Sequence, residues 1–365
     1  MNIKYIQLQS FRNYKKSSFS FEENAIHCLV GKNAQGKTNF IESIYFLSHL
    51  HSFRTHQMHD LITSQEEWMK IEATIETHQY DEKVKVLVSE NQRLLFHYDD
   101  PVRKFSDFVG IVNAILFCPD DMLLFKGSPR QRRRMIDMEL IKLSHTYTIT
   151  LSHYQKVLKE RNAALKQNHV DSIYIQTLTD QLIQDQMIIM KQRYSFVDRL
   201  YKQMVKLYPF FSLEKETIRL EYQTFVDMKQ DLQSQMKQAY ELSFEKDCKY
   251  KQTTLGIHKD DVLFLFDNKL MSQVASQGQK RSFLLAMKLG LAHIIYEAKK
   301  EYPILLLDDV FSELDTQRRQ QLIEHLPQSM QIFITTTEKI EPEWFKNRRF
   351  HIYQVQEGSL KEVSL

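Results

Sequence analysis

The stretch that decides the fold is Val30-Gly31-Lys32-Asn33-Ala34-Gln35-Gly36-Lys37-Thr38. It matches the P-loop pattern G-x-x-x-x-G-K-[ST], in which glycines let the backbone curl until its N–H groups point at phosphate oxygens. An apolar run at residues 25–30 precedes it, and a helix is expected over residues 37–50. A strand, a glycine loop and a helix in this order predict a nucleotide-binding site.

Each residue type of this loop has a chemical task. Lys37 is expected to reach the β- and γ-phosphates, and to be partly solvent-facing without nucleotide, while the Thr38 hydroxyl binds Mg²⁺. The helix N-terminus adds partial positive charge. The residues expected to contact ATP here are Gly31, Lys32, Asn33, Ala34, Gln35, Gly36, Lys37, Thr38 and Asn39.

A second motif supplies acidic residues. The apolar run 304–307 ends at Asp308 and Asp309, as in a central strand whose C-terminal end faces the P-loop. Asp308 is expected to hold Mg²⁺, directly or through water, and Asp309 to act as the general base or to orient the attacking water. Lys37 and Asp309 are therefore the predicted catalytic residues. Residues 312–315, Ser-Glu-Leu-Asp, resemble the D-loop of ABC ATPases, which adds Asp315 to the expected ATP contacts.

The third motif, Ser276-Gln277-Gly278-Gln279-Lys280-Arg281, stands directly before a long predicted helix. It resembles the ABC signature in its S-x-G-Q form, in which a serine hydroxyl and glycine amides point at a γ-phosphate. Ser276, Gly278 and Gln279 are thus further expected ATP contacts. In ABC ATPases the signature faces the nucleotide of another head, so the resemblance implies a head-to-tail homodimer that forms on ATP.

The chain divides into three regions. Residues 1–125 are predicted to form the N-terminal half of an ATPase head, with the P-loop and an antiparallel meander, and residues 253–365 its C-terminal half. Residues 126–252 are predicted to form a helical second lobe. Between Arg130 and Tyr208 there is neither Gly nor Pro, and apolar residues recur at helical spacing. This pattern predicts two long antiparallel helices that turn near residues 168–171. The predicted fold class is therefore α/β, an ABC-type head split by a mainly α-helical insert of roughly 130 residues.

Composition limits the other possibilities. No stretch approaches the ~18 apolar residues of a membrane helix, and residues 1–11 lack the apolar core of a signal peptide. Three cysteines without paired spacing suit a reducing compartment, so a cytoplasmic protein is expected. The formal net charge is only +3, so binding to DNA requires a local basic face.

With the three motifs placed, the chain resembles the SMC-like branch of ABC-type ATPases and, within it, the RecF family. The matching segments cover nearly the whole chain: Gln9-Ser10-Phe11-Arg12-Asn13-Tyr14, Ser52-Phe53-Arg54, Gly127-Ser128-Pro129 with the following arginines and Asp137, and Glu160-Arg161-Asn162-Ala163-Ala164-Leu165. SMC proteins proper carry much longer coiled coils than this insert allows.

The resemblance implies a weak, DNA-associated ATPase that uses ATP and Mg²⁺ and binds single-stranded, double-stranded and gapped DNA. It implies RecR as a partner, RecO and RecA as indirect partners, and roles in gap repair, replication restart and the SOS response. The sequence departs from the family at Gly256-Ile257-His258-Lys259, where the family has G-P-H-R. Asp309 replaces the Glu of transporters, which fits slow hydrolysis, and Thr335 to Thr337 stand where many ABC proteins place a switch histidine.

Two rival functions are considered. A transporter's nucleotide-binding subunit is disfavoured by the insert. The ATPase subunit of another SMC-like DNA-processing or anti-phage system is the alternative, although no acid cluster remains for a nuclease. Arg54 is expected to reach phosphate or DNA, or to form a structural ion pair. The arginines of residues 130–134 are expected to divide between DNA phosphates and internal ion pairs, since helical spacing puts them on different faces. His49, His51, His56 and His59 are interpreted as surface residues and not as a metal site.

Overall fold

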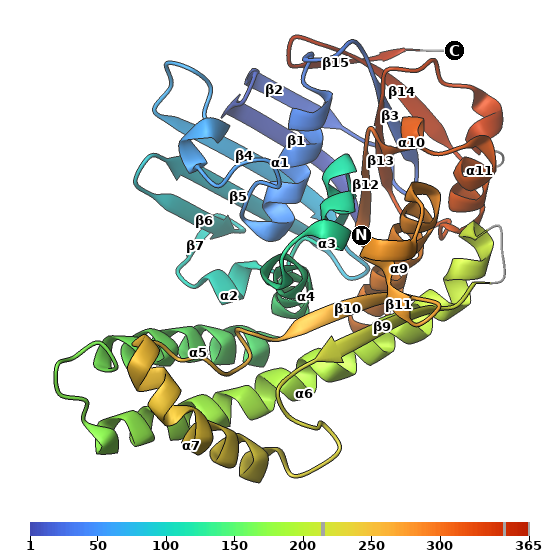
Figure 1. The fold of residues 1–365 in the computed structure, drawn as a ribbon. Helices are drawn as coiled ribbons and strands as arrows, with labels where there is room; N and C mark the ends of the chain where they lie inside the picture. The colour runs from blue at the N-terminus through green and yellow to red at the C-terminus, as the bar shows by residue number, and fades with distance from the viewer. Residues whose placement is uncertain (213–215, 346–347, 364–365) are drawn as a thin grey trace. The chain divides into compact units, whose positions relative to one another are not determined.

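The computed structural model describes residues 1–212, 216–345 and 348–363. The chain forms two compact units (Figure 1). The first comprises Met1–Asp121, Lys206–Leu213 and Arg281–Leu365, and the second comprises Met122–Val205 and Glu214–Lys280. The first unit thus combines the two ends of the sequence.

A mainly parallel sheet carries the site in the first unit. Its six strands run in the order β15 (Ser359–Val363), β14 (Phe350–Gln356), β3 (Ile26–Val30), β13 (Ile332–Thr336), β12 (Ile304–Asp308) and β8 (Ala114–Phe117). Strands β14, β3, β13, β12 and β8 are parallel, and β15 closes the edge as an antiparallel hairpin partner of β14. Every residue of β12 and β13 is buried, which explains the continuous apolar runs in the sequence. Strands β8, β14 and β15 were not predicted.

The second sheet of this unit is antiparallel. Its order is β2 (Tyr14–Ser20), β1 (Asn2–Phe11), β4 (Trp68–Glu76), β5 (Asp81–Ser89), β6 (Arg93–His97) and β7 (Asp100–Val102). In the inner part of β5, buried residues alternate with partly exposed ones, as expected for a sheet with one face on the core. The antiparallel meander predicted within residues 1–125 is confirmed as β4, β5 and β6.

Helix α1 (Lys37–His49) packs between these two sheets. Phe40 on α1 contacts Phe333 of the parallel sheet, with ring centroids 5.9 Å apart, and Phe19 of the antiparallel sheet at 5.6 Å. Helix α1, which follows the P-loop, therefore packs against both sheets. The unit also contains α2 (Phe105–Phe108), α10 (Val310–Glu313), α11 (Thr316–His325) and most of α9 (Gln277–Lys299).

The second unit is mainly helical. Its helices are α3 (Leu123–Lys126), α4 (Pro129–Leu143), α5 (His145–Ala164), most of α6 (Ser172–Phe211), α7 (Leu232–Tyr250) and α8 (Met271–Val274), beside a small sheet of β11 (Lys269–Leu270), β10 (Asp261–Phe266) and β9 (Ile218–Gln223). In the described part of the chain, no helix is long and apolar enough to cross a membrane.

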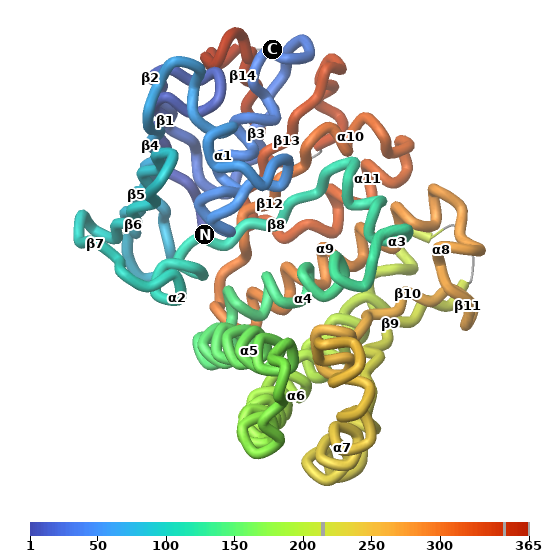
Figure 2. The backbone as a smooth tube through the Cα atoms, turned by 60° about the vertical axis from the view of Figure 1, so that its left-hand side comes forward, coloured from blue at the N-terminus to red at the C-terminus, as the bar shows by residue number. Residues whose placement is uncertain are grey.

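Helices α5 and α6 are antiparallel neighbours (Figure 2). Arg161 bonds Thr179 at 2.9 Å, while the earlier His153 bonds the later Asp185 at 2.7 Å. The predicted pair and its turn are thus confirmed, but the same sequence region holds three helices and not two. The break is at Ser144, whose hydroxyl accepts a hydrogen bond from the Tyr147 N–H at 3.1 Å and so caps α5.

Candidate nucleotide-binding site

The loop between β3 and α1 requires both of its motif glycines. Gly36 has φ +113°, and a Cβ there would lie 2.7 Å from the Asn13 Nδ2. A Cβ on Gly31 would lie 2.5 Å from the carbonyl oxygen of Val355 on β14. Any side chain at either position would displace neighbouring atoms, which is the reason that these positions hold glycine in a chain with only eight.

Two turns distant in sequence hold the same loop. From the β1–β2 turn, Asn13 Nδ2 donates to the Gln35 carbonyl oxygen at 3.0 Å, and the Tyr14 hydroxyl donates to that of Gly36 at 3.0 Å. From the β14–β15 turn, the Gly358 N–H donates to the Gln35 carbonyl oxygen at 3.1 Å. Asn13 and Tyr14 belong to a segment that resembles the family, but neither they nor Gly358 were predicted to hold the loop, since the turns show no nucleotide motif of their own.

Lys37 lies inside the loop. Its Nζ donates to the carbonyl oxygens of Gly31 at 2.7 Å and Lys32 at 2.9 Å, and only 8% of the residue is exposed. The expected partial exposure was wrong, because the ammonium group turns back onto the loop's own carbonyl groups. Burial lowers the pKa of Lys37, and the nearby carboxylates of Asp309 and Asp308 oppose this shift.

The end of β12 meets the start of α1. Thr38 Oγ1 donates to Asp308 Oδ1 at 2.9 Å, and Thr335 Oγ1 on β13 donates to the same oxygen at 2.8 Å. Burial raises the pKa of Asp308, and these two hydrogen bonds work against the rise. A hydroxyl and a carboxylate at this separation are oxygen donors of the kind that Mg²⁺ prefers, so the two residues fit the ion.

Asp309 differs from its neighbour because its side chain is exposed. Its backbone has φ +55°, and its N–H donates to Thr335 Oγ1 at 2.9 Å, which turns the chain sharply after β12. Ser312 Oγ donates to Asp309 Oδ1 at 3.4 Å and lies 3.3 Å from Thr336 Oγ1. The two threonines at the end of β13 therefore support the acidic pair, a role that the sequence alone did not reveal.

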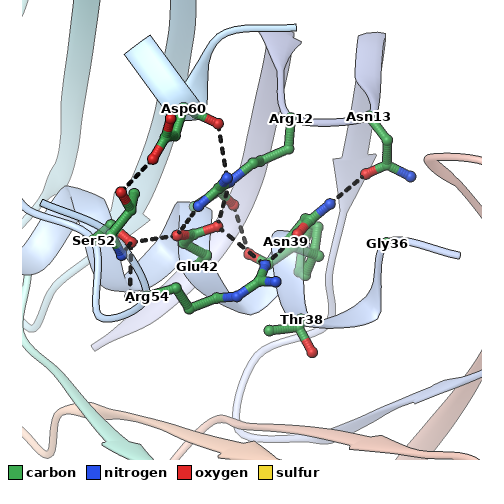
Figure 3. A network of polar contacts seen from close by, with 12 residues as sticks. Arg12, Asn13, Gly36, Thr38, Asn39, Glu42, Ser52, Arg54 and Asp60 are labelled. Carbon is green, nitrogen blue, oxygen red and sulfur yellow. Dashed lines mark hydrogen bonds and ion pairs between the residues drawn. The ribbon is translucent and has the colours of Figure 1, made fainter. Parts of the chain in front are cut away.

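A polar network extends from the loop along α1 (Figure 3). Asn39 Nδ2 donates to Asn13 Oδ1 at 2.8 Å, and Arg54 Nη1 donates to Asn39 Oδ1 at 2.8 Å. Glu42, fully buried on α1, receives two hydrogen bonds of 2.8 Å from Arg12. Arg54 thus contacts two residues of the P-loop helix, Asn39 and Glu42, while 44% of its side chain remains exposed.

The signature and D-loop residues form their own local contacts. The Gln279 N–H donates to Ser276 Oγ at 3.2 Å, and the Ser276 N–H donates to Gln279 Oε1 at 2.7 Å, which is a capping box at the start of α9. Asp315 caps α11 by accepting the Arg318 N–H at 2.9 Å. Contacts of Ser276, Gly278, Gln279 and Asp315 with ATP remain predictions.

The arginines of residues 130–134 divide as helical spacing requires. Arg132 forms two hydrogen bonds with the Asp261 carboxylate, at 2.8 and 2.9 Å, and Arg133 donates to the Asp260 carbonyl oxygen. These two are internal to the second unit. Arg130 and Arg134 are exposed, so only these two remain candidates for contacts with phosphate.

A single family model matches nearly the whole chain. Residues 2–361 match the model of the RecF/RecN/SMC N terminal domain. The DNA replication and repair protein RecF of Halalkalibacterium halodurans is 36% identical over 370 residues, covering 99% of this chain and 100% of the relative. That of Bacillus subtilis strain 168 is also 36% identical, over 371 residues, with the same coverage.

Solved structures agree. The structure of the recombination mediator protein RecF-ATP in the RecFOR pathway has a TM-score of 0.90 and 26% identity, covering 100% of this chain and 98% of that one. The Smc head domain of Pyrococcus furiosus, with an extended coiled coil and bound to the C-terminal domain of ScpA, has a TM-score of 0.56 and 15% identity, with 100% and 96% covered. The second likeness concerns the fold alone.

Proposed function

The chain belongs to the RecF family of DNA replication and repair proteins, and from this premise we propose that it is an ATP-switched DNA-binding protein with weak ATPase activity. The observation that carries the proposal is the 2.9 Å hydrogen bond between Thr38 and Asp308. It joins the P-loop helix to the acidic end of β12, as a site for a nucleotide and its metal ion requires.

The chain's own residues divide the work. The N–H groups of residues 31–38 and the Lys37 ammonium bind the phosphates, and Thr38 with Asp308 holds Mg²⁺. The metal supplies positive charge to the β- and γ-phosphate oxygens when it is bound. Asp309, exposed at the end of β12, orients a water molecule and takes up its proton. Its carboxylate is one methylene shorter than the Glu of transporters, in keeping with slow hydrolysis.

The dimer and the partners are part of the same proposal. ATP joins two heads, with Lys37 of one chain and Ser276 of the other at the same nucleotide, and hydrolysis releases them. The dimer binds single-stranded, double-stranded and gapped DNA. By analogy with the RecFOR-pathway protein of similar fold, it acts as a recombination mediator with RecR and RecO, and aids the loading of RecA.

The test is nucleotide binding by Lys37→Met. This variant should show no measurable binding of a fluorescent ATP analogue, since the ammonium group is lost from the phosphate site, and its circular dichroism spectrum should show that it remains folded although two hydrogen bonds to the loop are lost. Lys15→Met, at an exposed position of β2, is the matched control and should bind normally. Wild-type affinity in Lys37→Met would refute the assignment of the P-loop.

DNA binding is tested separately. Affinity for duplex DNA should rise with ATP and fall with salt, with a log–log slope of about −0.9 for each phosphate contacted. An affinity that is independent of both ATP and salt would refute an ATP-switched DNA-binding protein.

A further inference from the structure

One buried carboxylate in the first unit is shared by two arginines. Glu42 has no exposed side-chain surface. Arg12 approaches it side-on, with Nε and Nη2 each 2.8 Å from a different carboxylate oxygen. Arg54 Nη1 lies 3.7 Å from Glu42 Oε2. Together these three side chains carry two positive charges and one negative charge, and the negative one is buried.

The two arginines are held differently. Arg12 satisfies both oxygens of Glu42 and also donates to the Asp60 carbonyl oxygen at 2.7 Å, and only 17% of its side chain is exposed. Arg54 keeps 44% of its side chain exposed and has one close hydrogen bond, to Asn39. The positive charge that Glu42 leaves unneutralised is thus concentrated on Arg54, at the surface of the cluster.

Glu42 also fixes the backbone that carries Arg54. The Ser52 hydroxyl donates to Glu42 Oε1. The same hydroxyl accepts the N–H groups of Arg54 at 2.9 Å and Thr55 at 3.0 Å. The carboxylate therefore sets the orientation of Ser52, and Ser52 sets the turn from which the Arg54 side chain extends.

The Arg54 side chain extends toward Asn39 on α1 (Figure 3). It bonds Asn39, the residue directly after Thr38, whose hydroxyl bonds Asp308. A terminal phosphate beside Thr38 and Asp308 would lie within the field of this guanidinium group.

We propose that Glu42 is a positioning residue of the nucleotide site. It holds the Arg54 side chain toward the terminal phosphate in two ways, through Ser52 and through its own carboxylate, which Arg54 shares with Arg12. Because Arg12 takes most of the negative charge of Glu42, the positive charge of Arg54 is not neutralised. The inference rests on the proposed ATP site. It assigns a function to a buried acid that touches neither nucleotide nor metal. It also predicts that Glu42 favours ATP over ADP, because only ATP has a phosphate at the Arg54 end.

The test compares ATP and ADP affinities of the full chain. Arg54→Ala should weaken ATP binding by about tenfold, the effect of one charge-assisted hydrogen bond, and leave ADP binding within about twofold of wild type. Glu42→Gln should give the same selective loss, since a glutamine has one acceptor oxygen and turns an N–H₂ group toward a guanidinium. The double variant should be no worse than either single one, because both act through one side chain.

Two further variants serve as a control and as a milder substitute for Glu42→Gln. Asp121→Asn removes another nearly buried acid of the first unit, paired with Lys288 at 2.7 Å, and should leave the ATP-to-ADP ratio unchanged. If Glu42→Gln melts below the assay temperature, Ser52→Ala tests the same connection with a smaller change, and should again reduce affinity for ATP only.

Several outcomes would overturn the proposal. Equal losses for ATP and ADP in Glu42→Gln would mean that Glu42 only stabilises the fold. No loss for either nucleotide, or additive losses in the double variant, would separate Glu42 from Arg54. These results differ from a failure of the proposed function, in which the wild-type chain itself binds no ATP.

Discussion

The Thr38 hydroxyl on α1 and the Asp308 carboxylate at the end of β12 are joined by a hydrogen bond of 2.9 Å. The two residues come from opposite ends of the sequence, and their meeting aligns the P-loop with the acidic pair. Because a third group, Thr335, bonds the same carboxylate oxygen, the position of Asp308 is fixed from two neighbouring elements.

The raised pKa of Asp308 makes its metal binding dependent on pH. Burial favours the protonated form, and a protonated carboxyl group does not bind Mg²⁺, so Mg²⁺ affinity should fall as the pH decreases toward this pKa. The stability of the fold changes with pH in the opposite direction. Without metal, the Asp308 carboxyl group stabilises the folded state most at low pH, and this contribution is lost as the pH rises through its folded pKa.

Asp308→Asn tests both effects in one protein. Without metal, the variant should be more stable than wild type at neutral pH, since it buries no charge. It should also gain nothing from Mg²⁺ with ATP in a thermal melt. Stabilisation by Mg²⁺-ATP equal to that of wild type would contradict the role of Asp308 as a metal ligand.

Asp309→Asn should separate binding from hydrolysis. The side chain is exposed and Asn is of the same size, so ATP affinity should stay near wild type, while the loss of a general base should slow hydrolysis by about a hundredfold or more. The expected consequence is an ATP-dependent dimer that persists in size-exclusion chromatography. A variant that stays monomeric with ATP would argue against Asp309 as the acid that orients water.

Gly358→Ala should damage the nucleotide loop from a distance. Gly358 has φ +74°, and a Cβ would lie 2.4 Å from the Asn13 carbonyl oxygen, so the turn that bonds Gln35 must shift. We expect a loss of about 1–3 kcal/mol in unfolding free energy, the scale of a strained backbone position, together with weaker ATP binding. Ser359→Ala, which removes an exposed hydroxyl that bonds the nearby Gln356 carbonyl oxygen, is the control and should retain both properties.

The composite site is tested by mixing two defective chains. Lys37→Met damages the P-loop half of both sites in its homodimer, and Ser276→Arg damages the signature half. In the mixed dimer, one site gathers both defects and the other is intact, so ATP-dependent association should reappear in light scattering at micromolar protein. If association does not return, residues 276–281 are not acting as an ABC signature.

Sequence reasoning recovered what is encoded locally. The P-loop, the buried run 304–307 and the alternating runs of the meander each have a pattern set by their own periodicity and burial. It missed β8, a four-residue run whose partner β12 is far along the chain. It also missed the break at Ser144, where a single capping hydroxyl decides between one helix and two.

Only part of the site could be predicted from the sequence, because only residues in local motifs are recognisable there. Gly31, Gly36 and Thr38 are recognisable by spacing, but the burial of Lys37 depends on how the loop closes. The contributions of Thr335 and Gly358 depend on which strands become neighbours, and no short window of sequence contains that information. Glu42 looks like an ordinary helix residue until Arg12 is seen to pair with it.

The order of strands in the parallel sheet has a consequence for synthesis of the protein. Strand β3, which leads into the P-loop, lies between β13 and β14, and a ribosome makes both long after β3. Until they emerge, the apolar residues of β3 have neither neighbour, and Gln35 lacks its bond from Gly358. The nucleotide loop should therefore mature late, and a nascent chain should depend on holding chaperones and remain unable to bind ATP until β14 and β15 have emerged.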